Sequence, residues 1–428
     1  MKIIKYPAKE AWEALQQRPT LDMTALFDVA RTVLDDVRTD GDAAVKRYSE
    51  KFDRVSLSRL AVTPEEIREA ESLLPDDLKK AIRVAHDNIA AFHAAQRFDG
   101  VKVETMPGVT CWQKAVPIEK VGLYVPGGTA PLFSTVLMLA VPARIAGCHE
   151  IVLCTPPNKE GGIQPAILFS AQLAGVDKIF KAGGIQAIAA MTYGTESISK
   201  VYKIFGPGNQ YVMAAKQLVG MKDVATDMPA GPSEVAIIAD ETARPEFIAS
   251  DFLSQAEHGV DSQSLLLTTS EKLADDVVKE IEQQLTHLSR RELTGKSLAN
   301  SRIVILRSAD EMIAFSNQYA PEHLIIQTAD AKYARDRILN AGSVFLGAYT
   351  PESAGDYASG TNHTLPTNGY ARAYSGVNLD SFIKKITFQE ITKAGLSALG
   401  ATIEVMAANE QLDAHKNAVN IRLKNIES

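Results

Sequence analysis

Residues 121–155 read VGLYVPGGTAPLFSTVLMLAVPARIAGCHEIVLCT. An apolar run at each end, VGLYVP and EIVLCT, flanks a glycine-containing turn and a longer apolar segment over 133–146. Short continuous apolar runs are typical of strands in a parallel sheet, because helices cover both faces of such a sheet. The stretch therefore predicts a strand, a helix and a second strand that is parallel to the first.

The same alternation continues towards the C-terminus. Further strands are predicted at DKIFKAGG (177–184) and VYKIFGPG (201–208), with helices over 162–174, 185–193 and 209–219. The pattern then restarts with SEVAIIAD (233–240), SQSLLLTTS (262–270), RIVILRS (302–308), HLIIQTAD (323–330) and GSVFLGAY (342–349), separated by helices. These two stretches predict an α/β fold with two doubly wound lobes, Rossmann-like but incomplete, each with a parallel sheet.

Both ends of the chain are predicted to be helical. Apolar residues follow a helical spacing in the first hundred residues, most clearly over 23–52, and no strand pattern is found from about residue 378 onward. We expect an N-terminal arm (1–25), a first lobe (26–123 and 233–377), a second lobe (124–232) inserted into it, and a helical tail (378–428). The tail has an apolar face and no sheet to cover it, so a second subunit is expected to bury it.

Composition restricts the class of protein. The chain has 428 residues, of which 46% are hydrophobic and 23% charged, as in globular proteins of more than one domain. A net charge of −7 disfavours nucleic acid or an anionic membrane as a partner. We find no signal peptide, and the apolar run over 136–141 is too short to cross a bilayer, so we expect a cytoplasmic protein. Three cysteines without motif spacing predict neither a disulfide framework nor a thiolate metal site.

Glycine-marked turns point to a nucleotide cofactor. KIFGPGNQYVMAAK (203–216) predicts a strand, a Gly-Pro-Gly turn and a helix capped by Asn209, whose free N–H groups suit a phosphate. Taken alone, this pattern also fits a tight turn without a ligand. However, YVPGGTAPLFS (124–134) and KAGGIQAIA (181–189) mark two further turns after strands. Ligands bind at that edge of an open α/β sheet, so a nucleotide cofactor is favoured.

Two short stretches contain candidate metal ligands and general bases. SQAEHGVDS (254–262) places Gln255 and His258 three residues apart, either at the end of an ordinary helix or facing one metal ion. YAPEHLII places Glu322 and His323 before a strand, where a neutral imidazole and a carboxylate suit two proton transfers. Neighbours in a regular strand face opposite sides, so both reach one site only if the turn at Pro321 is irregular. Otherwise they are an exposed glutamate and a partly buried histidine.

Two further segments allow two interpretations each. TPESAGDYASGTNH (350–363) contains Asp356 and His363 as candidate ligands, but such a loop is also typical of a solvated turn. His415 shares a helical face with Val419, which is typical of a packing residue. Residue spacing alone does not favour a metal, since there is no HExxH motif and no cysteine pair.

Longer strings make the pattern more specific. The chain contains, in order, GLYVPGGTAPLFSTVLMLAVPA, FGPGNQYV, DMPAGPSEV, DFLSQAEHGVDSQ, NQYAPEHLI and GSVFLGAYTPESAGDYASGTNHTLPT. Together they resemble the histidinol dehydrogenase family from about residue 25 to the C-terminus. The resemblance implies an NAD-dependent zinc enzyme that oxidises L-histidinol through L-histidinal to L-histidine, the last step of histidine biosynthesis.

The resemblance also implies the site residues. It places catalysis on Glu322 and His323, and NAD binding in the second lobe, on Tyr124, Gln186 and Asn209. One zinc per subunit would be held by Gln255, His258, Asp356 and His415, the last from the partner of a homodimer. The substrate would be bound by Ser233, Gln255, His258, His323, Asp356, His363, Glu410 and His415. The catalytic and metal residues then belong mainly to the first lobe, and the tail crosses to the partner.

Two functions of other classes compete with this one. A zinc hydrolase would use Glu322 to activate water without NAD, and a two-lobed nucleotide-binding module would have no catalysis. Under the implied function His323, as a neutral base, removes the alcohol proton, and Glu322 activates water for the aldehyde step. Formation of reduced nicotinamide from NAD and L-histidinol distinguishes the three.

Overall fold

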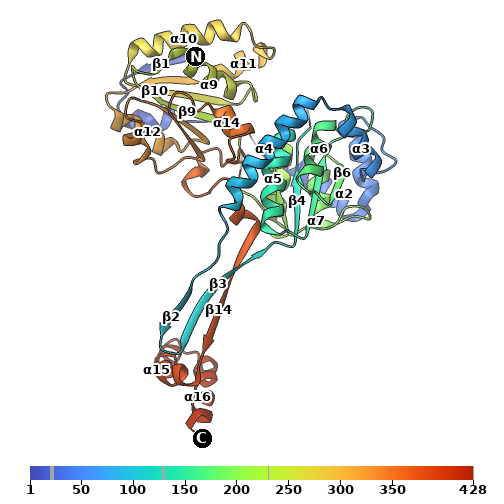
Figure 1. Ribbon diagram of the computed structural model, residues 1–428, viewed down its shortest axis with the longest axis vertical. Helices are drawn as coiled ribbons and strands as arrows, with labels where there is room; N and C mark the ends of the chain where they lie inside the picture. The colour runs from blue at the N-terminus through green and yellow to red at the C-terminus, as the bar shows by residue number, and fades with distance from the viewer. Residues whose placement is uncertain (20–23, 128–130, 230, 428) are drawn as a thin grey trace. The chain divides into compact units, whose positions relative to one another are not determined.

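The computed structural model describes residues 1–19, 24–127, 131–229 and 231–427 (Figure 1). It divides into two compact units, the first formed by residues 1–96 and 118–382 and the second by residues 97–117 and 383–428. The first unit contains two parallel sheets, and the second contains an antiparallel sheet and two helices. In the described residues no helix has the length and apolar character that a membrane crossing requires.

A six-stranded sheet forms the first lobe. Its order is β1-β11-β10-β9-β12-β13, with β1 Lys2–Lys5, β9 Glu234–Ala239, β10 Gln263–Thr268, β11 Arg302–Ile305, β12 His323–Gln327 and β13 Ser343–Leu346, all parallel. Its helices are α1 Trp12–Leu15, α9 Pro245–Ala256, α10 Glu271–Leu285, α11 Arg291–Ser297, α12 Ala309–Tyr319, α13 Ala331–Arg335 and α14 Glu352–Tyr357, with short 3-10 turns at Lys9–Ala11, Leu298–Asn300, Tyr370–Arg372 and Leu379–Phe382. Val235 and Ile237 pack into one core and Ala236 into the core on the opposite face, as alternation along a strand requires.

A five-stranded parallel sheet forms the second lobe. Its order is β6-β5-β4-β7-β8, with β4 Lys120–Tyr124, β5 Glu150–Thr155, β6 Lys178–Lys181, β7 Lys203–Phe205 and β8 Ala225–Thr226. Its helices are α5 Phe133–Ala146, α6 Pro165–Leu173, α7 Gly184–Tyr193 and α8 Gln210–Gly220. The chain crosses from one side of β4 to the other at β7, which creates a topological switch point between these strands. The prediction of two doubly wound lobes is confirmed.

The N-terminal helices lie in a different place from the one that we expected. They are α2 Thr24–Tyr48, α3 Pro64–Leu73 and α4 Asp76–Ala94, with a π-helical turn at Ser49–Asp53. We expected residues 26–123 in the first lobe, but α2 packs on α7 and α8, α3 on α6, and α4 on α5 of the second lobe. The amphipathic pattern predicts a buried face without saying which sheet it covers. The chain before the inserted lobe contributes β1 to the six-stranded sheet, where it pairs with β11.

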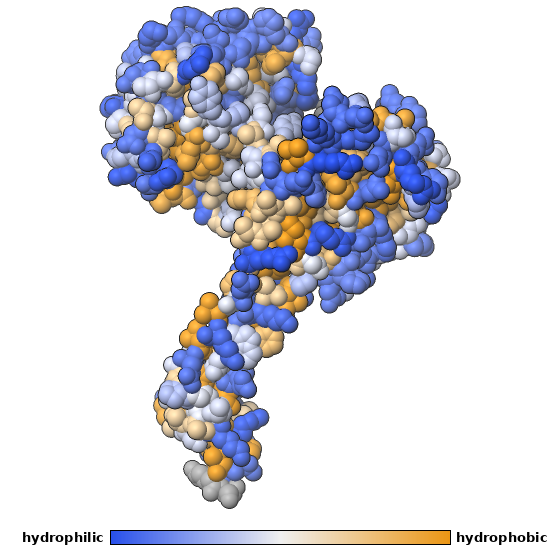
Figure 2. All heavy atoms as spheres, viewed as in Figure 1, coloured by the Kyte–Doolittle hydropathy of each residue, from blue (hydrophilic) through white to orange (hydrophobic). Residues whose placement is uncertain are grey.

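The second unit corrects the prediction for the tail. Its sheet has the order β14-β3-β2, with β2 Lys102–Met106, β3 Val109–Pro117 and β14 Ile383–Ile391, and is followed by α15 Lys393–Asn409 and α16 Asp413–Glu427. The expectation of no strand after residue 378 is therefore wrong. Almost every residue of β14 is exposed, so the strand has no apolar run by which a buried strand is predicted. Figure 2 shows hydrophobic residues on the surface of this unit. Val101, Phe388 and Val405 are among its exposed large hydrophobic side chains.

Candidate active site

Glu322 and His323 lie together at the start of β12. Ala320 has a left-handed φ of 54°, so the chain turns irregularly before Pro321. As a result, Glu322 Oε2 lies 3.7 Å from His323 Nδ1, and both side chains are buried. The irregular turn that a shared site requires is confirmed.

Three carboxyl groups surround the imidazole of His323. Besides Glu322, Glu352 Oε1 lies 3.9 Å from Nδ1, and Asp356 Oδ1 lies 3.3 Å from Nε2. Burial lowers the pKa of His323, but the three carboxylates raise it more, to about 10. Burial raises the pKa of Glu322 and of Glu352 to about 8. A cation bound beside these carboxylates would oppose protonation of His323.

Gln255 and His258 come from the end of α9. Gln255 is fully buried, and its neighbours define its orientation: the amide nitrogen faces Glu352 Oε1 at 2.5 Å, and the amide oxygen faces the backbone N–H of Glu234 at 3.1 Å. His258 follows the helix and is exposed. Both side chains lie at the edge of the group around His323, because Glu352 lies close to Gln255, to His258 and to His323.

A group of three side chains has metal-binding geometry. Ligand atoms of His258, Glu352 and Asp356 all lie within 4.8 Å of one another. Nitrogen and oxygen donors without a thiolate suit zinc in a site that also binds substrate. The residues present thus fit the implied ion. Glu352 was not among the predicted ligands, although Glu352 and Asp356 are four residues apart, which places both on one face of α14.

The remaining predicted substrate residues lie in both units. His363 Nδ1 donates a hydrogen bond to the carbonyl oxygen of Asp356 (2.8 Å). Its Nε2 therefore accepts a hydrogen bond from the hydroxyl group of Thr135 (3.1 Å). Ser233 is half-buried directly before β9. Glu410, at the end of α15, and His415, on α16, belong to the second unit and are exposed. His415 is therefore not a packed residue within that unit, and its role as a zinc ligand stays a prediction.

A large cavity lies at the carboxyl edge of the five-stranded sheet. Its volume is about 830 Å³, and Tyr124, Gln186 and Asn209 are among the residues that line it. Asn209 caps α8 by accepting from the backbone N–H groups of Tyr211 (3.1 Å) and Val212 (3.2 Å), as predicted. Tyr124 ends β4 and Asn209 lies in the turn after β7, so the cavity lies at the topological switch point.

Two details of this cavity extend the prediction. The Gly184 N–H donates to the hydroxyl oxygen of Tyr124 (3.1 Å), and burial raises the pKa of Tyr124 to about 12. Gln186 donates weakly to Asp53 (3.5 Å), which also lines the cavity and was not predicted. The turn over 124–134 lies partly outside the described residues. A cavity of this size with a few polar groups suits a nucleotide cofactor.

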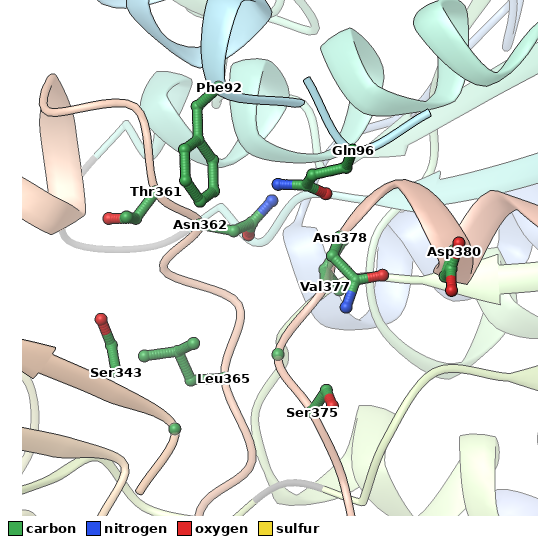
Figure 3. A pocket seen from close by; sticks show the side chains of 12 residues that line it. Phe92, Gln96, Ser343, Thr361, Asn362, Leu365, Ser375, Val377, Asn378 and Asp380 are labelled. Carbon is green, nitrogen blue, oxygen red and sulfur yellow. The ribbon is translucent and has the colours of Figure 1, made fainter. Parts of the chain in front are cut away.

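A smaller cavity of about 450 Å³ lies beside β13. Figure 3 shows the amides of Gln96, Asn362 and Asn378 around it, with Ser343 and Leu365 nearby. Asn362 donates to the carbonyl oxygen of Met138 (2.6 Å), so it anchors the loop that carries His363 to α5. This cavity therefore borders the loop of the candidate site, and its lining offers amides, hydroxyls and the single carboxylate of Asp380.

Comparison with known proteins gives one consistent result. The family model for histidinol dehydrogenase matches residues 16–423. The chain is 66% identical to a histidinol dehydrogenase of Bacteroides thetaiotaomicron over 426 residues, which cover 100% of both chains. It is 54% identical to that of Salmonella typhimurium, over 97% of this chain and 95% of the relative. The crystal structure of histidinol dehydrogenase from Elizabethkingia anophelis superimposes with a TM-score of 0.98 at 54% identity, covering 100% of this chain and 99% of that one.

Proposed function

The chain belongs to the histidinol dehydrogenase family, and on this premise we propose that it oxidises L-histidinol through L-histidinal to L-histidine with two molecules of NAD. The observation that carries the proposal is the group around His323. A buried imidazole 3.7 Å from Glu322 lies beside three side chains with metal-binding geometry. This combination supplies proton transfer and substrate orientation in one place.

We assign the proton transfers to His323 and Glu322. In the first step His323 accepts the hydroxyl proton of L-histidinol as the hydride leaves the same carbon for NAD. The aldehyde carbon must then be hydrated, because a hydrate has a hydrogen and a hydroxyl group from which the second oxidation can proceed. Glu322 accepts a proton from the attacking water, while the protonated His323 returns its proton to the aldehyde oxygen. The neutral His323 then accepts the hydroxyl proton of the hydrate as the second hydride leaves for NAD. NAD supplies the hydride acceptor in both steps.

We assign zinc binding to Gln255, His258 and Asp356, together with His415 of the partner subunit. Zinc, when bound, supplies orientation of the substrate's nitrogen atoms and positive charge beside the carboxylates. A cation held by these residues would favour the neutral imidazole of His323, which is the form that accepts a proton.

We assign NAD to the cavity of the five-stranded sheet. Tyr124, Gln186 and Asn209 line it, and the N-termini of α7 and α8 begin beside it at Gly184 and Gln210. Backbone N–H groups at helix N-termini suit the pyrophosphate of a dinucleotide. The cavity lies at the switch point, where dinucleotides bind in sheets of this order.

We also propose a cytoplasmic homodimer whose active sites are shared. Figure 2 shows hydrophobic residues on the surface of the second unit. Large side chains are exposed on its sheet, at Ile386 and Phe388, and on α15, at Val405 and Met406. Exposed large apolar side chains favour an interface. Substrate contacts then come from Ser233 and His363, and from Glu410 and His415 of the partner subunit.

One assay tests the proposal against its competitors. Purified zinc-loaded protein is mixed with NAD and L-histidinol, and absorbance of reduced nicotinamide is followed. We expect two molecules of NADH for each L-histidine formed. A zinc hydrolase would form no NADH with any NAD concentration, and a nucleotide-binding module would bind NAD in calorimetry without turnover.

A further inference from the structure

Arg18 of the N-terminal arm binds a buried carboxylate at the start of β9. Its guanidinium contacts Glu234 through two nitrogens, Nε to Oε2 and Nη2 to Oε1, the latter at 2.8 Å. The side chains of Arg18 and Glu234 are only 13% and 2% exposed. A bidentate (two-pronged) contact of this kind fixes the orientation of both groups, whereas a single contact with a lysine would not.

The same guanidinium holds a second segment of the chain. Nη2 of Arg18 donates to the carbonyl oxygen of Tyr319 (2.7 Å), and the guanidinium carbon lies 3.8 Å from the Tyr319 ring centroid. The Tyr319 hydroxyl also donates to Gln263 Oε1 (2.8 Å). Tyr319 ends α12 and precedes Ala320, whose φ of 54° is uncommon for a residue with a Cβ. Such a conformation persists where the surroundings fix it.

The start of β9 and the turn after α12 both position Glu322. The backbone N–H of Glu234 donates to Glu322 Oε2 (2.9 Å), and the turn from Tyr319 leads directly to Glu322. We propose that Arg18 is a positioning residue for the reaction, because it clamps Glu234 and Tyr319 and so fixes the Glu322 carboxylate beside His323. The inference rests on the proposed function for the role of Glu322. Arg18 itself contacts neither reacting group.

Simple attachment of the arm is the competing explanation, and the chain offers a matched control. Arg302, on β11, donates to the carbonyl oxygens of Leu15 and Gln17, the latter at 3.2 Å. It therefore holds the same arm as Arg18. However, none of the contacts described for Arg302 is with Glu234. Loss of Arg302 loosens the arm, whereas loss of Arg18 also leaves a buried carboxylate without its cation.

The experiment is a double-mutant cycle in the full-length, zinc-loaded enzyme. Turnover of L-histidinal is measured for wild type, R18Q, E322Q and R18Q/E322Q, with R302Q and R302Q/E322Q as controls. R18Q is expected to lower kcat about tenfold or more, within the roughly 10²- to 10⁴-fold contribution of a general base. In the E322Q background R18Q should change kcat by less than about twofold, because groups that act as a unit are not additive. R302Q should cause the same small loss in both backgrounds.

The possible outcomes distinguish the role proposed for Arg18 (the clamp on Glu234 and Tyr319) from the role proposed for Glu322. Equal losses from R18Q in the two backgrounds would overturn the clamp, as would a loss no larger than that of R302Q. If E322Q alone retains full turnover of L-histidinal, the proposed role of Glu322 fails instead. R18K, which keeps the charge without the two-pronged contact, serves if R18Q does not fold. It should give an intermediate, non-additive loss, and an additive loss in R18K would equally contradict the clamp.

Discussion

Glu352 and Asp356 lie one turn apart on α14, and both approach the imidazole of His323, at 3.9 Å from Nδ1 and 3.3 Å from Nε2. Glu352 also accepts from the amide nitrogen of Gln255 (2.5 Å) and lies within 4.8 Å of the ligand atoms of His258 and Asp356. It therefore links the proposed base to the proposed metal ligands, either as a ligand itself or by orienting Gln255.

Replacement of Glu352 should weaken zinc binding. We expect E352Q to lower zinc affinity by about 10- to 100-fold, the usual cost of removing a group that orients a ligand. Competition with a zinc-binding indicator dye measures this affinity. E257Q is the control, since Glu257 directly precedes His258 but does not belong to the group of three. Equal affinities of E352Q and wild type would exclude Glu352 from the metal site.

The two oxidation steps should respond differently to the two bases. H323N is expected to suppress both steps, since His323 accepts a proton in each. E322Q should slow L-histidinal oxidation by about 10² or more while slowing hydride transfer from L-histidinol less, because only the aldehyde step requires activated water. Single-turnover formation of NADH from each substrate separates the steps. Equal losses of E322Q with both substrates would contradict the division of roles.

Removal of the metal should abolish turnover without unfolding the protein. The proposed ligands lie on α9, directly after α9, on α14 and on α16, whereas stability comes from the apolar cores on both faces of two sheets. We therefore expect no activity after chelation and a circular dichroism spectrum that is nearly unchanged. Added zinc should restore turnover. Loss of helical signal on chelation would instead show that the ion supports the fold.

Affinity for NAD should fall on acidification. Burial raises the pKa of Asp53 to about 6. If its carboxylate accepts from a hydroxyl of NAD, the contact is complete well above pH 6 and is lost as pH falls through 6. A hydrogen bond to a charged group is worth about tenfold or more in Kd. Calorimetric titration of NAD from pH 5 to 8 should show this decrease in wild type.

D53N should bind NAD about tenfold more weakly at pH 8, without the dependence near pH 6. E160Q is a matched control, because Glu160 also lines the cavity. The same pH dependence in D53N and wild type would assign the titration to another group.

The two parallel lobes could be predicted from the sequence, because buried strands appear in it as continuous apolar runs. The helix over 133–146 has the predicted bounds, and the turn before His323 has the predicted irregularity. The antiparallel sheet was missed, since β14 pairs with β3 from a distant part of the chain and is exposed on both faces. A strand that is not buried shows no periodic distribution of apolar residues by which it could be predicted.

Parts of the site could not be predicted from the sequence. Glu352 lies on a helix of six residues, which is too short to show periodicity and reads as a polar loop. Arg18 and Glu234 are 216 positions apart, and nothing in either segment predicts the pair. By contrast, Gln255 and His258 could be considered together because both lie on one short stretch, although their assignment as ligands came from the family resemblance and stays a prediction. Local spacing can suggest that two side chains of one element share a site, but it does not predict contacts between elements.

The strongest test of the shared active site combines two inactive variants. We expect H415A and H323A each to be inactive as homodimers, because every site lacks one histidine. After co-expression, half the dimers are mixed if pairing is random. Each mixed dimer has one site with His323 of one subunit and His415 of the partner subunit, and one site with neither. About a quarter of wild-type activity should therefore return. If His415 served its own subunit, every site would still lack one histidine. A mixed dimer verified by two affinity tags that remained inactive would exclude the shared site and leave His415 an exposed residue of α16.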